Sequence, residues 1–150
     1  MHVNIVCDSN TKLCLDIKTK GKNAGKKIVL EERKGSDSQE FILTGNRLVA
    51  KSSGKAMEFN ADPQHPKILL VEQNMTSKQT WNFFDDMTIR NTDGKCLDTK
   101  GGKIKTGSKL ILTNQSNQPS QKWRVTRAND PQCKAIAPAE LLLSQCCLLL

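Results

Sequence analysis

Short apolar stretches alternate with polar turns along most of the chain. Representative apolar stretches, bounded by Gly, Ser, Asn or Asp, are residues 3–7 (VNIVC), 28–32 (IVLEE), 47–51 (RLVAK), 68–72 (ILLVE), 81–85 (WNFFD), 110–113 (LILT) and 123–127 (WRVTR). Such segments are typical of β-strands, and helical periodicity is hard to find before residue 135. The pattern predicts an all-β protein.

Three sequence elements recur in the same order. The most distinctive element is Gln-x-aromatic, at Gln39-Phe41, Gln79-Trp81 and Gln121-Trp123. Twelve residues before each Gln, a lysine begins an apolar stretch, at Lys27, Lys67 and Lys109. Further upstream, one slot always holds an acidic residue, namely Asp16, Glu58 or Asp98. The order predicts three repeats, at about residues 3–43, 44–85 and 86–127, and about four strands in each makes about twelve.

The Gln-x-aromatic spacing has a physical explanation. Residues i and i+2 lie on the same face of a strand. The aromatic side chain can therefore fill the core while the Gln amide points the same way and pairs with loop backbone groups. Three copies indicate three equivalent corners around an axis.

As an ordered set, these motifs resemble the ricin B-type lectin family. The resemblance implies a β-trefoil, which is a six-stranded barrel capped by three hairpins, over residues 1–133, with a C-terminal tail at 134–150. It also implies carbohydrate binding without catalysis. Secretion is expected from the resemblance, although the opening MHVNIVCDSN has no signal-peptide pattern.

The resemblance further implies one shallow sugar site per repeat. Carried over by position, the predicted carbohydrate-binding residues are Asp98, Lys100, Thr113, Ser120 and Gln121 in the third repeat, and Asp16, Ser38 and Gln39 in the first. The family's stacking aromatic falls on Glu31, Val71 and Thr113, and the chain has no Tyr. The alternative is therefore a structural role for the carboxylates, which accept loop N–H groups.

The positive charge also bears on the ligand. Net charge is +8, and the first 127 residues hold 22 basic against 13 acidic residues. Lysine-rich glycine loops at 17–27 and 99–109 adjoin the predicted sites of the first and third repeats. We expect a preference for acidic or sulfated glycans, and the alternative is that these lysines only promote solubility. The rival function is a β-trefoil that has lost sugar binding and acts through protein contacts, as an inhibitor or a structural component.

Other functions find little support in the residues. Two histidines and no C-x-x-C pair predict neither a metal site nor a cofactor. The acidic pairs Glu31-Glu32 and Asp85-Asp86 are neighbours that would face opposite sides of a strand, so we expect no enzyme. No apolar run reaches 18 residues, which argues against a membrane span. Nucleic acid is not an expected partner because exposed stacking aromatics are lacking.

The tail and the cysteines raise separate questions. The sequence PAELLLSQCCLLL from Pro138 predicts a short apolar helix, which must be buried on its own barrel or against a second copy. We favour a homodimer, with Cys146 and Cys147 available to link the chains. Because the ends of a closed barrel are adjacent, Cys7 and Cys133 are candidates for a disulfide. Cys14 and Cys96 lack the partners that the resemblance implies, and we expect them to be buried thiols.

Overall fold

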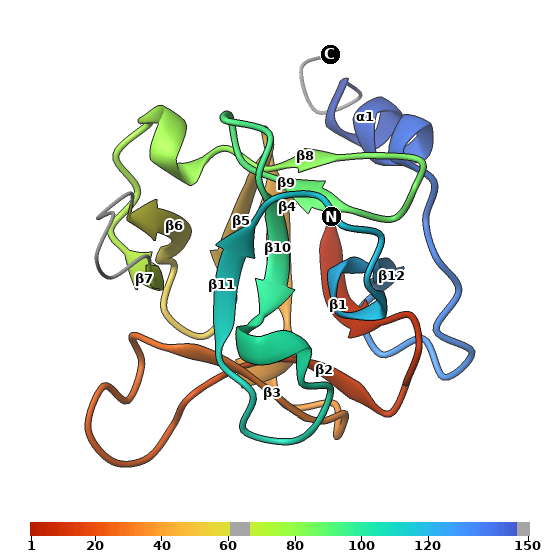
Figure 1. Cartoon of the computed structure of the whole chain (residues 1–150). Coiled ribbons are helices and arrows are strands. Elements are labelled where there is room, and N and C mark those ends of the chain that lie inside the picture. The colour runs from red at the N-terminus through yellow and green to blue at the C-terminus, as the bar shows by residue number, and fades with distance from the viewer. Residues whose placement is uncertain (61–66, 147–150) are drawn as a thin grey trace.

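The computed structural model describes residues 1–60 and 67–146, with side chains described as far as residue 143. Within these ranges the chain forms twelve strands, four short 3₁₀ helices and one α-helix (Figure 1). They are β1 (His2–Cys7), β2 (Leu13–Ile17), β3 (Ile28–Glu32), η1 (Asp37–Gln39), β4 (Phe41–Thr44), β5 (Arg47–Ala50), β6 (Ala56–Asn60), β7 (Lys67–Val71), η2 (Ser77–Gln79), β8 (Asn82–Phe83), β9 (Ile89–Arg90), β10 (Cys96–Thr99), η3 (Lys100–Gly102), β11 (Leu110–Thr113), η4 (Pro119–Gln121), β12 (Trp123–Arg127) and α1 (Pro138–Cys146).

The strands form the predicted β-trefoil. The six barrel strands pair as β12–β1–β4–β5 and, in a second sheet, as β8–β9. Backbone bonds from Trp81 N to Asn46 O at 2.9 Å and from Trp123 N to Met87 O at 2.8 Å connect the two groups. The second and third strands of each repeat form antiparallel hairpins, β2–β3, β6–β7 and β10–β11. A single residue pair joins each hairpin to the preceding barrel strand, for example Val6 with Cys14. The first and last barrel strands meet, so these two strands leave no open edge between them.

The aromatic residues of the three repeat motifs fill the core, as predicted. Phe41 and Trp81 are fully buried and Trp123 is nearly so. Each indole N–H donates to a backbone oxygen of the adjacent hairpin, from Trp81 to Met57 at 2.9 Å and from Trp123 to Leu97 at 3.0 Å. A large apolar ring is thus buried without an unpaired polar atom.

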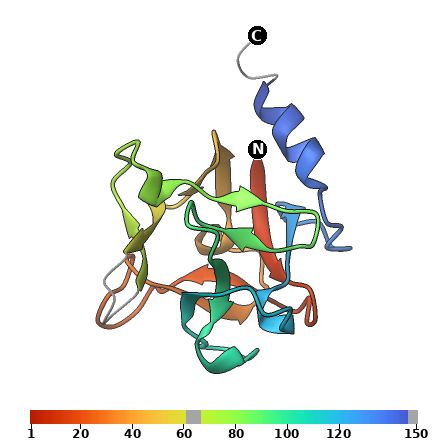
Figure 2. The ribbon, with the colours of Figure 1, turned by 45° about the horizontal axis from the view of Figure 1, so that its top comes forward.

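The C-terminal segment docks on its own barrel. Ala135 bridges to Thr126, and the N–H of Ile136 donates to the carbonyl of Val125 at 2.8 Å. Ile136 and Leu141 are buried in the core cluster. Helix α1 then projects past the β8–β9 side of the barrel (Figure 2). No helix within the described ranges is long and apolar enough to span a bilayer.

Cys7 and Cys133, the candidates for a disulfide, are both buried free thiols in the structure. Cys7 belongs to the barrel core, whereas Cys133 packs with Val6 and Cys14. Val6 and Cys7 are neighbours on β1 and therefore face opposite sides. Closing the barrel brings the chain ends together, but it places the two sulfur atoms on different faces of β1. Cys14 and Cys96 are buried free thiols, as predicted.

Candidate functional site

In every repeat the motif glutamine bonds to the acidic residue of the same repeat. The three glutamines are fully buried. Their Nε2 atoms donate to a carboxylate oxygen, at 3.0 Å in Gln39–Asp16, 3.2 Å in Gln79–Glu58 and 3.2 Å in Gln121–Asp98. The short 3₁₀ helix ending at each Gln holds the amide against the hairpin. The structure therefore has three equivalent glutamine–carboxylate pairs, one in each repeat.

Each pair also fastens the loop that follows the hairpin. The Gln amide donates to a backbone carbonyl at 2.7–2.9 Å, on Glu32, Glu72 or Asn114. Its Oε1 accepts from a backbone N–H at 2.9–3.1 Å, on Lys34, Asn74 or Ser116. The amide thus satisfies loop groups that would otherwise lack partners.

The third repeat brings its predicted residues together. Asp98 Oδ2 accepts from Thr113 Oγ1 at 2.6 Å as well as from Gln121, and Asp98 Oδ1 accepts from the N–H of Thr99 at 2.7 Å. Thr113 Oγ1 in turn accepts from Gln121 Nε2 at 2.7 Å. Both Asp98 oxygens therefore have donors inside the protein, two on Oδ2 and one on Oδ1.

The turn after β10 lies beside this network. Gly102 has a φ of +69°, and a Cβ on it would lie 3.7 Å from Ser120 Oγ. Ser120 is buried, while Lys100 at the start of the same turn is exposed. Of the predicted residues, Ser120 therefore lies within the protein and Lys100 faces solvent.

The first repeat differs from the third because one oxygen of its carboxylate has no hydrogen-bond partner among the described residues. Asp16 is buried, and its Oδ2 accepts from Gln39 Nε2. Its Oδ1 is buried without any hydrogen-bond partner. Ser38, partly buried, instead exchanges a hydrogen bond with Ser36 at 2.9 Å. A buried carboxylate oxygen without a hydrogen-bond partner destabilises the folded state. A donor that reached Asp16 Oδ1 would remove this cost.

The family's stacking slot is occupied by Glu31, Val71 and Thr113, at equivalent places on β3, β7 and β11. All three are only partly buried. Thr113 uses its hydroxyl to bind Asp98, so in the third repeat this slot completes the polar network.

Sequence reasoning did not single out a hollow where the three hairpins meet. It has a volume of about 400 Å³, and four lysines line it, Lys27, Lys67, Lys100 and Lys109. The sequence did carry a signal for it, because Lys27, Lys67 and Lys109 occupy one repeat position.

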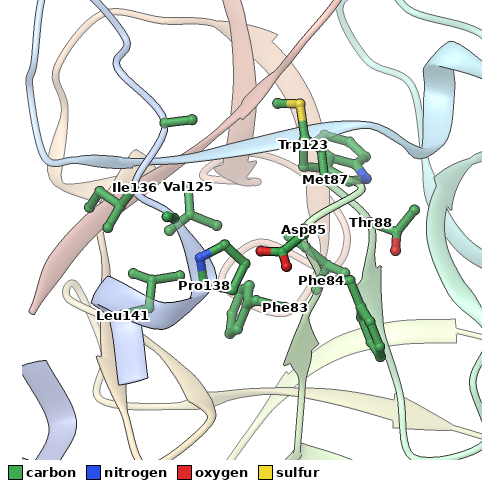
Figure 3. Close-up of a pocket in the computed structure, with 13 residues that line it drawn as sticks. Phe83, Phe84, Asp85, Met87, Thr88, Trp123, Val125, Ile136, Pro138 and Leu141 are labelled. Carbon is green, nitrogen blue, oxygen red and sulfur yellow. The ribbon is translucent and has the colours of Figure 1, made fainter. Parts of the chain in front are cut away.

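A second hollow lies beneath the tail. It measures about 250 Å³ and lies between the β8–β9 hairpin and residues 135–141 (Figure 3). Its lining is mostly apolar, with Phe83, Ile136 and Leu141 among the contributors, and Asp85 is the one acidic residue among the described residues that line it. Across the described residues, no group of His, Cys, Asp or Glu is arranged to hold a metal ion.

A three-fold barrel that carries a glutamine–carboxylate pair in each repeat defines a β-trefoil of lectin type. The family model described as "Ricin-type beta-trefoil lectin domain" matches residues 2–130. The chain therefore belongs to the ricin-type β-trefoil lectin family. Among curated proteins, none matches this sequence.

Solved structures share the fold at low sequence identity. The Vibrio vulnificus hemolysin/cytolysin β-trefoil lectin with bound N-acetyl-D-lactosamine has a TM-score of 0.66 and 24% identity, covering 86% of this chain and 96% of that one. The Macrolepiota procera ricin B-like lectin in complex with lactose has a TM-score of 0.68 and 20% identity, covering 85% and 95%. In GalNAc-T7 with UDP, GalNAc and Mn²⁺, the similar region is only 22% of that chain.

Proposed function

We propose that this protein is a non-enzymatic carbohydrate-binding lectin with shallow sites in the third and first repeats. The observation that carries the proposal is the repeated glutamine–carboxylate pair, held at the same place in each repeat. Carboxylate oxygens are suitable acceptors for sugar hydroxyls. Support also comes from β-trefoil lectins of the same fold that hold lactose or N-acetyl-D-lactosamine.

The two favoured sites would receive a sugar differently. In the first repeat, a hydroxyl would donate to Asp16 Oδ1, the oxygen without a partner, and because this oxygen is buried the side chains that cover it would have to move. In the third, it would replace the Thr113 hydroxyl on Asp98. The second repeat is the weakest candidate, because its acidic residue is the longer Glu58 and its stacking slot holds the aliphatic Val71.

We further propose a preference for acidic or sulfated glycans. The lysines of the two glycine loops, Lys18, Lys20, Lys22, Lys26, Lys100, Lys103 and Lys105, are exposed. None of them forms an ion pair with a residue in the described ranges. Their charge is therefore available to an anionic ligand. Retention on immobilised heparin at physiological salt tests this, and elution below about 0.1 M salt, where screening is modest, contradicts it.

A glycan array that includes neutral and sulfated sugars tests the main proposal. We expect binding, and we expect Asp98→Ala to lose more of it than Glu58→Ala. Both variants must retain the wild-type circular dichroism spectrum. Equal losses contradict the ranking of the repeats, and no bound glycan at high protein concentration refutes the lectin function.

The tail favours a second candidate function, protein contact through a homodimer. Leu142 and Leu143 are 60% and 65% exposed on α1, and Phe84 is 41% exposed. Exposed apolar side chains of this size are typical of association surfaces. The suggested link through Cys146 and Cys147 lies outside the described side chains. Light scattering should give a dimer mass for the wild type and a monomer mass for Leu142→Gln/Leu143→Gln, and a monomeric wild type contradicts the dimer.

We also propose an extracellular location, on the basis of family resemblance. Fractionation of the source cells and their medium tests it, and a protein confined to the cells contradicts it.

A further inference from the structure

The three hairpins converge on the pseudo-three-fold axis. Lys27 on the first hairpin bridges to Leu69 on the second, and Val29 bridges to Lys109 on the third. Backbone bonds reinforce the contact, from Leu70 N to Lys26 O at 2.9 Å and from Leu30 N to Ser108 O at 3.0 Å. The starts of strands β3, β7 and β11 therefore meet at one place.

A lysine occupies the same repeat position at the start of each of these strands, directly before β3 and β11 and as the first residue of β7. Lys27, Lys67 and Lys109 line the hollow of about 400 Å³, and Lys100 adds a fourth ammonium group. The following residues, Ile28, Ile68 and Leu110, also line the hollow and are buried. The described lining includes no acidic residue. We call this hollow the axial pocket.

Among the described residues, no carboxylate compensates the positive charge in the axial pocket. None of its four lysines has an ion-pair partner within residues 1–60 and 67–146. The pKa of Lys27 is lowered by burial and then by the positive charges of Lys109, Lys18 and Lys67. Such repulsion opposes folding, and an anion that binds among the lysines relieves it.

We propose that the axial pocket binds a ligand carrying several sulfate ester or phosphate groups. A tetrahedral oxyanion presents three equivalent oxygens about a three-fold axis, which matches three lysines related by the pseudo-three-fold axis. Each ammonium group supplies up to three N–H donors. The axial pocket measures about 400 Å³, whereas one water molecule takes up about 30 Å³ in the liquid. It therefore has room for more than one phosphate or sulfate group. The site differs from the glutamine–carboxylate pairs and does not require sugar binding by the repeats.

Two probes distinguish a ligand with phosphate groups from a ligand with sulfate ester groups. Inorganic tripolyphosphate carries phosphate groups without a sugar, and sucrose octasulfate carries sulfate esters. Isothermal titration calorimetry at fixed ionic strength measures the affinity of the full chain for each. Binding of one probe alone supports the axial pocket and names the group it takes. If neither probe binds, the proposal is overturned.

Matched charge removal locates the site. The axial variant is Lys27→Gln/Lys67→Gln/Lys109→Gln, and the control is Lys12→Gln/Lys95→Gln/Lys134→Gln. All three control lysines are exposed and lie outside the hollow, and both variants lose three positive charges. We expect the axial variant to bind at least about tenfold more weakly, from the loss of charge-assisted contacts, and the control to change by less than about threefold.

Equal weakening in both variants would indicate general charge attraction and overturn the proposal. The single variant Lys109→Gln provides a milder test should the triple axial variant fold poorly, and an unchanged affinity in it also counts against the axial pocket. Asp98→Ala should leave the affinity for tripolyphosphate unchanged. Failure of the repeat sugar sites is thereby distinguished from failure of the axial pocket.

Discussion

Replacing a motif glutamine by leucine tests the reasoning about the glutamine–carboxylate pairs. Gln121→Leu introduces an apolar side chain of similar size. It removes the two amide N–H donors, which Asp98, Thr113 and Asn114 share, and the oxygen that accepts from the N–H of Ser116. Asp98 keeps its bonds from Thr99 and Thr113. At about 1 kcal/mol for each net bond, partly offset by burial of leucine, we expect a loss of about 3 kcal/mol.

Gln39→Leu should cost more. Gln39 is the described donor to Asp16, because the other Asp16 oxygen has no partner. Removing the amide leaves a buried carboxylate with no donor on either oxygen among the described residues, which costs about 3 kcal/mol or more by itself because the group is charged. We expect a total loss of about 5 kcal/mol, which is comparable to the whole stability of a marginal domain.

Urea unfolding followed by tryptophan fluorescence measures both losses, since Trp81 and Trp123 are buried. Gln115→Leu is the matched control, because Gln115 is exposed and makes one bond, to Asp86 at 3.2 Å. Its cost should stay within about 0.5 kcal/mol. Losses below about 1 kcal/mol in both motif variants would refute the structural role of the glutamines. Equal losses would refute the argument from the unpaired Asp16 oxygen.

Three further outcomes follow from the structure. Trp123→Phe leaves the Leu97 carbonyl without its indole donor and should cost about 2 kcal/mol in urea unfolding, whereas no loss would show that the bond is dispensable. Burial raises the pKa of Cys7 and Cys14 to about 12, so these two thiols should resist iodoacetamide at pH 8 until urea is added. The unfolded thiols release protons first, so these thiols should lower the free energy of unfolding as pH rises above about 9, and a contribution that stays constant to pH 11 contradicts the raised pKa. Lys109→Gln removes the largest charge effect on Lys27, so the pKa of Lys27 should rise in an NMR titration, and an unchanged value would mean that the two side chains are far apart.

Strand and repeat positions could be predicted from the sequence because they depend on local spacing. The ring lies in the core and the amide bonds the loop, as predicted, but the assumed strand period of two is wrong there, because Gln121 ends the 3₁₀ helix η4 and only Trp123 lies on β12. The parity of neighbouring residues on a strand also explains the failure of the Cys7–Cys133 prediction. That prediction considered the adjacency of chain ends and not the face on which each sulfur lies.

The partners of the acidic residues could not be predicted in the same way. Thr113 reaches Asp98 across the β10–β11 hairpin from 15 positions away, and strand register sets that contact. Asp16 occupies the equivalent slot, yet the first repeat has Glu31 where the third has Thr113. The same motif therefore yields a carboxylate with donors on both oxygens in the third repeat and a carboxylate with one unpaired oxygen in the first.

The sequence alone determined the three-fold repetition, the strand pattern and the residues that form the corners, since each depends on neighbours within a few positions. The tertiary structure decided which equivalent residues meet. Lys27, Lys67 and Lys109 are 40 and 42 positions apart, and only closure of the three hairpins about one axis gathers their charges in a single hollow. The three positive charges repel one another, so the backbone pairing of the hairpins must hold the lysines in the axial pocket.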